Sequence, residues 1–421
     1  MCYSPDAKKV LMISYFFPPL GGAGVQRVQK FVKYLPQFKI KPYVLTVKPV
    51  EYIAYDETLL DEIKLFTPIY RSESLDPMRI LYFIEKFRKS KKRAYTNTSS
   101  SLKNLSRDIF PIDSKIGWLP FAIGKGVKLC KEKNIKVIYA TLPPFSASLV
   151  AYFVSKITGI PYVLDYRDLW QGKPEITYLT NWHKKVSIYW EKKVLGSAIK
   201  VIINTGLSLK KIQSIYPEIE KGKFTVIHNG YDEADFNVDY KKDESKIIFT
   251  YTGGFYGERT PEYFVKALSN IKDKLPDNVE FHFVGNYDYE TLQWLQKVPK
   301  RIKIIDQVTH LKSIQYLLES DFLMIFIAKR NSEIVIPAKL FEYLATAKPI
   351  LAMVPTKGEV ANIVNNEKVG LVCAPDDINK IEKNILELIK NREQFVIKKD
   401  AFGRFSRKNL TLKLSELLNE I

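Results

Sequence analysis

A lysine and a glutamate stand one helical turn apart in the stretch IVIPAKLFEYLATAKPILAMVP (residues 334–355). The pattern predicts a strand end, a turn, a helix and a further strand, with Pro337 and Ala338 at the start of the helix. Free backbone amides and the helix dipole at that end favour an anion such as a diphosphate. Lys339 adds a positive charge there. Glu342, on roughly the same face of the helix, can accept hydrogen bonds from a ribose diol.

A second cation, Arg259, lies in the stretch YTGGFYGERTPEYF (residues 251–264), just after an expected strand. Gly253 and Gly254 let the backbone bend there, and the following Thr-Pro pair opens the next helix. A cation beside a helix N-terminus suits a diphosphate leaving group. A single Lys or Glu on a helix face is usually only solvated, but three such groups converging on one crevice are rarely accidental.

The loop SYFFPPLGGAGVQR (residues 14–27) follows the first expected strand and also contains several glycines. A dinucleotide fingerprint would need a third glycine where Arg27 stands, and a carboxylate near Lys48 on the next strand. The nicotinamide interpretation therefore fails, and the chain has no P-loop motif. What remains is a loop whose amides at Gly21 and Gly22 can face a phosphate or a sugar, with a simple tight turn as the alternative.

Short apolar runs alternate with amphipathic helical stretches along both halves of the chain. This pattern is typical of parallel sheets covered on both faces, and it predicts an α/β protein with two doubly wound, Rossmann-like domains. The acidic, turn-rich stretch at 229–245 marks the boundary. We expect an N-terminal domain over 1–230 and a C-terminal domain over 231–421, whose last helix is a candidate to return to the first. Residues 50–118 fit the alternation poorly and form a basic insertion.

The net charge of +19 lies entirely in the first half: residues 1–230 contain 37 Lys and Arg against 18 Asp and Glu, whereas the rest contains 28 of each. Such asymmetry predicts an anionic partner, either a membrane surface or a nucleic acid. The stretch at 79–95 carries seven basic residues and one acidic residue, with apolar residues at helical spacing. It is either a membrane-surface helix or a solvated helix packed on its own domain.

The sequence contains no apolar run of the roughly 20 residues that a membrane-spanning helix needs. Three scattered cysteines and four scattered histidines suggest neither a disulfide framework nor a metal site.

Taken together, these motifs resemble those of the GT-B glycosyltransferases, specifically the retaining family-4 type that builds bacterial surface polysaccharides. The resemblance covers nearly the whole chain and rests on FFPPLGGAGVQR, GIPYVLDYRDLW, IHNGYD, YTGGFYGER and, most specifically, PAKLFEYLATAKPIL. It implies that the two domains face each other across a cleft. The C-terminal domain would bind a nucleotide sugar and the N-terminal domain the acceptor.

The resemblance also implies roles for individual residues. Arg259 and Lys339 would contact the diphosphate, with Gly254 and Ala338 nearby, and Glu342 the ribose. The Gly21-Gly22 loop would face the donor, and the loop near Val308 is a weaker candidate for contacting the base.

Two positions depart from the family pattern. The first of the family's two glutamates, eight residues apart, would fall at Ile334, with Glu333 one residue away. A histidine that many members place after the strand PYVLDY is replaced by Arg167 followed by Asp168. We predict that Arg167 and Asp168 supply the polar groups near the reacting carbon, with a structural Asp–Arg pair as the alternative.

These inferences predict a metal-independent, retaining glycosyltransferase that uses a UDP- or GDP-linked sugar and requires no other cofactor. The acceptor would be a glycan or a lipid-linked oligosaccharide. The enzyme would be cytoplasmic and peripheral at the inner face of the cell membrane. A sugar-nucleotide 2-epimerase of similar fold is the nearest rival. A basic nucleic-acid-binding protein is the rival from another class, and no recognisable reading motif supports it.

Overall fold

The computed structural model describes residues 6–50, 52, 55–64, 67–80, 82, 110–172, 178–330, 332–395, 397 and 399–421. The chain forms two compact units. Unit 1 comprises the chain up to His228 together with Arg407–Ile421, and unit 2 comprises Asn229–Ser406. Most of the basic stretch at 79–95 lies outside the described residues.

Unit 1 is built on a seven-stranded sheet in the order β3-β2-β1-β4-β5-β6-β7, and every strand pairing is parallel. The strand order reverses between β1 and β4, which is where open α/β sheets leave a crevice beyond the carboxyl ends of their strands. The strands are β1 Lys8–Ile13, β2 Ile40–Val47, β3 Ile69–Ser72, β4 Val137–Leu142, β5 Tyr162–Tyr166, β6 Lys200–Ile203 and β7 Phe224–Val226.

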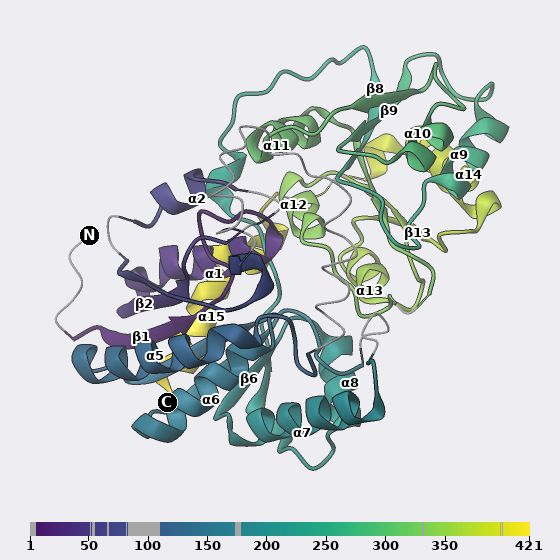
Figure 1. Cartoon of the computed structure of the whole chain (residues 1–421). Helices are drawn as coiled ribbons and strands as arrows, with labels where there is room; N and C mark the ends of the chain where they lie inside the picture. The colour runs from purple at the N-terminus through teal and green to yellow at the C-terminus, as the bar shows by residue number, and fades with distance from the viewer. Residues whose placement is uncertain are drawn as a thin grey trace. The chain divides into compact units, whose positions relative to one another are not determined.

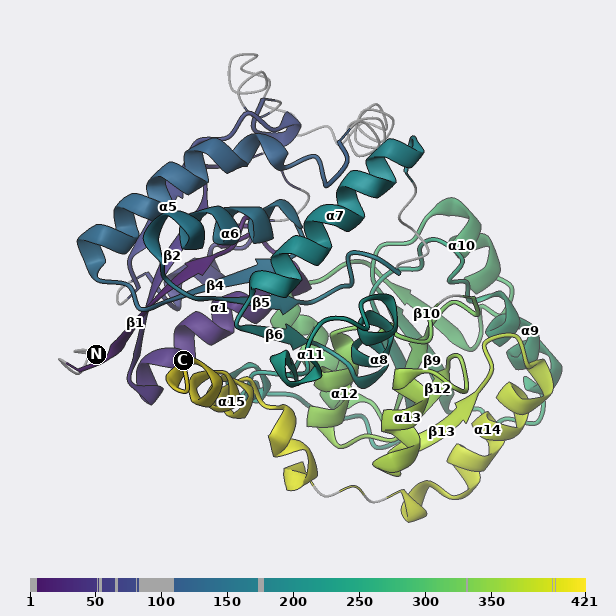
Figure 2. The same ribbon diagram turned by 90° about the horizontal axis from the view of Figure 1, so that it is seen from below.

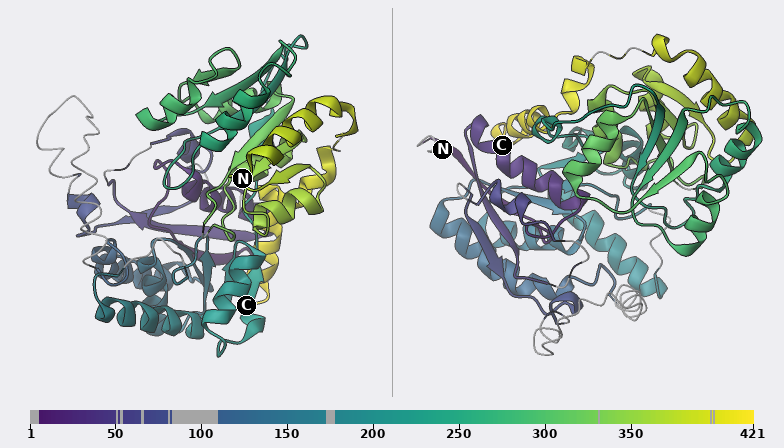
Figure 3. Two further views of the ribbon diagram at one scale, coloured as in Figure 1. Left: turned by 90° about the vertical axis from the view of Figure 1, so that its right-hand side faces the viewer. Right: turned by 90° about the horizontal axis from the view of Figure 1, so that it is seen from above.

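The helices of unit 1 form separate groups around the sheet. They are α1 Ala23–Tyr34, α2 Thr58–Asp61, α5 Leu119–Lys133, α6 Ser146–Thr158, α7 Asn181–Ser197, α8 Gly206–Ile215 and α15 Arg407–Asn419, with 3₁₀ turns at Leu35–Phe38, Ile116–Trp118 and Lys221–Lys223. Helices α5, α6 and α7 lie side by side (Figures 1 and 2). Helix α15, at the end of the chain, packs against α1 (Figure 3). Leucines of α15 and apolar residues of α1 at helical spacing share one buried core, which explains why the last helix belongs to unit 1.

Unit 2 has a six-stranded parallel sheet in the order β10-β9-β8-β11-β12-β13, with its reversal between β8 and β11. Its strands are β8 Ile247–Thr252, β9 Val279–Val284, β10 Ile302–Ile305, β11 Phe322–Phe326, β12 Ile350–Met353 and β13 Gly370–Cys373. Its helices are α9 Glu262–Ile271, α10 Tyr289–Leu295, α11 His310–Glu319, α12 Lys339–Thr346, α13 Glu359–Asn366 and α14 Ile378–Lys390, with 3₁₀ turns at Glu233–Phe236, Arg392–Gln394 and Lys399–Phe405.

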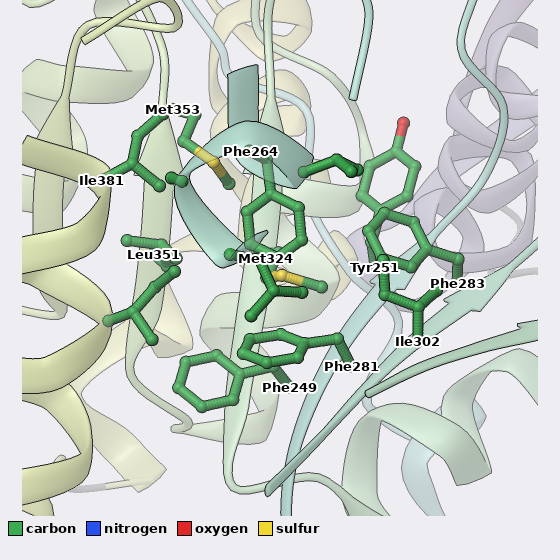
Figure 4. Close-up of a cluster of buried hydrophobic side chains, with 14 of the residues drawn as sticks. Phe249, Tyr251, Phe264, Phe281, Phe283, Ile302, Met324, Leu351, Met353 and Ile381 are labelled. Atoms are coloured by element: carbon green, nitrogen blue, oxygen red, sulfur yellow. The ribbon is translucent and has the colours of Figure 1, made fainter. Parts of the chain in front are cut away.

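An aromatic core fills one side of the unit 2 sheet, beneath α9, α10 and α14 (Figure 4). Phe249 of β8 stacks on Phe281 of β9 and Phe322 of β11, with ring centroids 4.9 and 4.5 Å apart. Aromatic pairs of this kind stabilise the folded state by more than the burial of their apolar area alone would. A second core under α11, α12 and α13 fills the other side. The end of β8 is therefore held between two packed layers, which gives the loop after it a rigid base.

The two parallel sheets with their covering helices confirm the predicted α/β class with two doubly wound units. Within the described residues, none of the helices combines the length and the apolar character needed to span a membrane.

Candidate functional site

The predicted lysine of α12 reaches the end of β8 in unit 2. Lys339 Nζ donates a hydrogen bond to the carbonyl oxygen of Thr252 and lies 4.1 Å from the centroid of the Tyr251 ring. A Cβ placed on Gly253 would lie only 2.5 Å from this nitrogen, and Gly253 has a φ of +108°. A glycine is thus required at 253 both for its backbone conformation and for the space that the ammonium occupies.

Arg259 brings a second cation to the same strand end. Its guanidinium carbon lies 4.7 Å from the centroid of the Tyr256 ring. Its Nε is buried and has no hydrogen-bond partner within the described part of the chain. Burial lowers the pKa of Lys339 to about 7, helped by the charge of Arg259 and opposed by that of Glu342. A lysine whose pKa is lowered by burial and partly by a second cation lies where a bound anion is stabilising.

The start of α12 leaves its amides without a side-chain cap, because Ala338 at the N-cap position offers no acceptor. Tyr343, one turn into the helix, accepts a hydrogen bond from the Thr252 backbone N–H (3.1 Å). This bond and the contact of Lys339 with Thr252 fix the helix start beside the β8 turn, where Gly254 follows. The structure therefore brings Gly254, Arg259, Ala338 and Lys339 together, at the strand-order reversal of the sheet.

Glu342 lies near this group and has a partner that the sequence interpretation missed. His310 Nε2 donates to Glu342 Oε1 at 3.0 Å, and the Glu342 side chain is 19% exposed. His310 is the first residue of α11, two residues after the predicted Val308, which is half-buried in the loop that leads to this helix. The sequence did contain a signal for this contact, because the loop near Val308 was already expected to lie near the base of the nucleotide. His310 was instead grouped with the other scattered histidines of the chain.

Glu333 and Ile334, where the resemblance would place the first of two glutamates, lie in a turn before α12. Val335 N–H donates to the Ser332 carbonyl at 3.0 Å, closing the turn, with Glu333 exposed and Ile334 half-buried. The Glu333 carbonyl accepts from the backbone N–H of Glu359, the first residue of α13 (2.8 Å). Glu333 is thus fixed through its backbone while its carboxylate faces solvent.

In unit 1, the glycine loop leads from β1 into α1. Gly22 is the N-cap of α1 with a φ of +98°, and no side chain caps the helix. A Cβ at Gly22 would meet nothing within 4 Å, so its backbone conformation, and not crowding, requires glycine. Gly21 is buried and Gly22 exposed, which leaves the start of α1 accessible on the side of Gly22.

Arg167, just after β5, binds backbone carbonyls of its own unit. Its Nε donates to the Leu142 carbonyl (3.1 Å), and its terminal nitrogens donate to the carbonyls of Gly24 and Pro143. A Cβ on Gly24 would lie 2.9 Å from Arg167 Nη1. These contacts tie the end of β4 to the first turn of α1. Asp168 beside it is half-buried.

A fully buried ion pair lies under the same loop. Arg27 donates through Nε and Nη2 to the two carboxylate oxygens of Asp165 in β5, at 2.9 and 2.8 Å. Both side chains are 0% exposed. Burial alone would raise the pKa of Asp165, but the Arg27 charge and hydrogen bonds from Arg27 and Tyr139 outweigh it and lower that pKa. Arg27 therefore stands where a dinucleotide motif would have its third glycine, and its role there is a structural ion pair with Asp165.

An open pocket of about 660 Å³ lies in unit 1 where the chain enters α7. Its lining is mainly polar and includes Gln171, Tyr178, Thr180, Asn181 and Lys184. The Glu191 carboxyl anchors one wall, because it accepts a hydrogen bond from the Gln171 backbone N–H (3.1 Å). Hydroxyl, amide and ammonium groups of this kind suit a glycan or a phosphate.

Among the described residues, no three His, Cys, Asp or Glu side chains gather closely enough to hold a metal ion.

Parts of this chain are similar to known proteins. Residues 246–391, which contain the Lys339 and Arg259 cluster, match the family described as Glycosyl transferases group 1. The matched residues lie within unit 2. The capsular polysaccharide biosynthesis glycosyltransferase CapH of Staphylococcus aureus is 24% identical over 234 residues, which are 53% of this chain and 61% of that protein.

Solved structures extend the likeness to the whole GT-B fold. A glycosyltransferase from Rickettsia africae superposes with a TM-score of 0.63 at 16% identity, over 98% of each chain. Anabaena HepE, solved in complex with UDP, gives the same TM-score and identity over 98% of this chain and 100% of its own. The likeness to these structures thus covers both units and shows the GT-B fold alone.

Proposed function

We propose that this protein is a glycosyltransferase that moves a sugar from a UDP- or GDP-linked donor to an acceptor hydroxyl, with the donor bound by unit 2. The observation that carries this proposal is the crowding of Lys339 and Arg259 at the end of β8, beside the uncapped start of α12. Glu342, one turn further along α12 and held by His310, is positioned to accept hydrogen bonds from the ribose. The match to group 1 and the UDP complex of HepE support the same assignment.

The chemistry needs stabilisation of a leaving diphosphate. The bond between the sugar's anomeric carbon and the diphosphate oxygen breaks, and the diphosphate leaves with the electron pair. The acceptor oxygen forms its new bond on the same face of the sugar, and its proton passes to the diphosphate. Lys339, Arg259 and the α12 amides stabilise the charge that develops, without a metal ion in the proposed scheme.

Unit 1 would hold the acceptor. The polar pocket before α7 and the glycine loop at Gly21 and Gly22 offer groups that suit a glycan or a lipid-linked oligosaccharide. Asp168 remains our candidate for a polar group near the reacting carbon. Because the Arg167 guanidinium binds three carbonyls, we assign Arg167 to positioning this loop and, through it, to catalysis. The basic first half favours a cytoplasmic enzyme at the inner face of the membrane.

A thermal-shift panel of UDP, GDP and their sugars tests the donor, because a ligand that binds only the native state raises its stability. Glu342→Ala should abolish both the shift given by the best sugar nucleotide and its turnover, while the unfolding temperature without ligand stays near that of the wild type. Glu290→Ala, on the exposed surface of α10, is the matched control and should behave as the wild type. Wild-type turnover by Glu342→Ala would exclude this donor site.

A further inference from the structure

We infer that the outer face of α7 docks unit 1 onto an anionic lipid surface. This inference deepens the proposed function, because it names the part of the enzyme that would meet a lipid-linked acceptor. The face consists of Trp182, Lys185, Tyr189 and Lys193, and we call it the α7 face.

The four residues form one stripe along the helix. Their spacing of three, four and four residues keeps them on one side of an α-helix. The opposite side carries the buried residues Ser187, Glu191, Val194 and Leu195, which attach α7 to the rest of unit 1. Two large aromatic side chains of the helix, Trp182 and Tyr189, are therefore in solvent, while a serine and a glutamate are buried beside Val194 and Leu195.

The aromatic side chains of this stripe are exposed to an unusual degree. Trp182 is 61% exposed and Tyr189 58% exposed, and Leu179, just before the helix, is 63% exposed. The other four tryptophans of the chain, Trp118, Trp170, Trp190 and Trp294, are buried or half-buried. Apolar side chains gathered along one surface helix mark an interaction site rather than ordinary surface.

The charge of the helix is suited to anionic lipid. Within the described part of the chain, Lys184, Lys185 and Lys193 have no carboxylate partner, whereas Lys192 pairs with Glu218 at 2.8 Å. Burial raises the pKa of Glu191, the one glutamate of α7, to about 8, so it is largely uncharged at neutral pH. Lysine ammonium groups therefore dominate the electrostatics of this surface.

The neighbouring helices extend the same character. Helices α5, α6 and α7, which lie side by side, together contain nine lysines and two glutamates. Their exposed residues include Phe121 and Ile157 as well. On the α1 side, by contrast, Arg27 pairs with Asp165, and Lys30 and Lys33 pair with Glu62. The excess of lysine and the exposed apolar side chains are thus found on the same three helices, whose backbones lie side by side in Figure 2.

A lipid surface fits these features better than a nucleic acid or a protein partner. Tryptophan and tyrosine favour the membrane–water interface, and lysine stems reach from apolar surface to head groups. An amphipathic helix that binds lipid through one such face lies parallel to the membrane surface, at the membrane–water interface. The polar pocket is lined by Asn181 and Lys184 of the first turn of α7, the same turn that carries Trp182, so the pocket and the α7 face are close along the chain.

Vesicle flotation of the full chain tests the inference, with phosphatidylcholine vesicles and an equal mixture of phosphatidylcholine and phosphatidylglycerol. We expect binding to the mixed vesicles only. The double variants Trp182→Ser with Tyr189→Ser, and Lys185→Glu with Lys193→Glu, should each weaken that binding by at least about tenfold. Brominated lipids should quench part of the tryptophan emission of the wild type, and Trp182→Phe should lose that part.

Two control variants separate docking from general attraction. Lys408→Glu with Lys413→Glu changes two exposed lysines of α15 in the same unit, and Tyr289→Ser removes an aromatic side chain that is 77% exposed on α10. Both should bind vesicles as the wild type does. The inference is overturned if the α7 variants bind vesicles normally, or if the α15 variant loses as much binding. It is equally overturned if the α7 variants lose affinity for RNA or DNA instead.

The thermal shift with sugar nucleotides, measured without vesicles, keeps this result separate from the proposed function. The α7 variants should retain that shift in full, which also shows that they fold. Vesicle binding by a protein that no sugar nucleotide stabilises would contradict the proposed function and leave the α7 face supported.

Discussion

The two units differ in whether the cations at the carboxyl ends of their central strands have partners within the protein. In unit 1, Arg27 has the carboxylate of Asp165, and Arg167 donates to three carbonyls. In unit 2, burial and then the charge of Arg259 lower the pKa of Lys339, and the buried Arg259 Nε has no partner in the described structure. A cation whose partners are all internal is a structural element. Two crowded cations with incomplete partners are a site for an external anion.

The sharpest way to break this comparison is to remove the internal partner in unit 1. Asp165→Asn leaves the guanidinium of Arg27 buried without a balancing charge, which typically costs about 3–5 kcal/mol. We expect the unfolding transition of unit 1 to fall accordingly in chemical denaturation. Glu218→Gln, which breaks the exposed pair with Lys192, is the control and should leave the unfolding transition close to that of the wild type. If Asp165→Asn were as stable as the wild type, Arg27 would not be the structural cation described above.

The converse change in unit 2 should affect turnover and not stability. Lys339→Met removes a charge that burial disfavours, so the unfolding temperature without ligand should stay the same or rise. Donor turnover should fall by about 10²–10³-fold, the usual effect of losing one group that stabilises a developing negative charge. Steady-state kinetics with the best sugar nucleotide, beside a thermal melt, measures both. A variant that turned over normally but unfolded more easily would reverse the roles assigned to the two units.

Much of the fold could be predicted because it depends on local pattern. Near-continuous apolar runs separated by amphipathic helices are typical of parallel sheets, and the two doubly wound units follow from them. The grouping of Lys339, Arg259 and Gly254 was also predictable in outline, since loops after neighbouring parallel strands meet at one edge of a sheet.

What the sequence did not reveal was pairing across distance. Arg27 was recognised only as a residue that breaks a dinucleotide motif, because its partner Asp165 is 138 residues away. A carboxylate in the buried strand PYVLDY was itself a signal that a buried cation had to exist. His310 was missed for a similar reason, since only the packing of α11 against α12 brings it to Glu342.

The smallest expected effect concerns the protonation of Lys339. With its pKa lowered to about 7, this side chain is only partly charged in the empty site near neutral pH. A bound diphosphate raises that pKa, so the favourable interaction is fully available below about pH 7 and is lost as pH rises above it. Affinity for UDP should therefore fall by several-fold between about pH 7.5 and pH 9.

Calorimetry at about pH 8 in two buffers of different ionisation heat measures the proton directly. Binding of UDP should take up a substantial fraction of one proton per site, because the diphosphate restores the charge of Lys339. Lys339→Met should bind more weakly, with no such uptake and a flat pH profile over this range. Uptake that persisted in Lys339→Met would assign the proton to another group. A wild-type affinity for UDP that did not depend on pH would mean that the pKa of Lys339 is not lowered in the empty site. The contrast drawn between the cations of unit 1 and unit 2 would then be wrong for this residue.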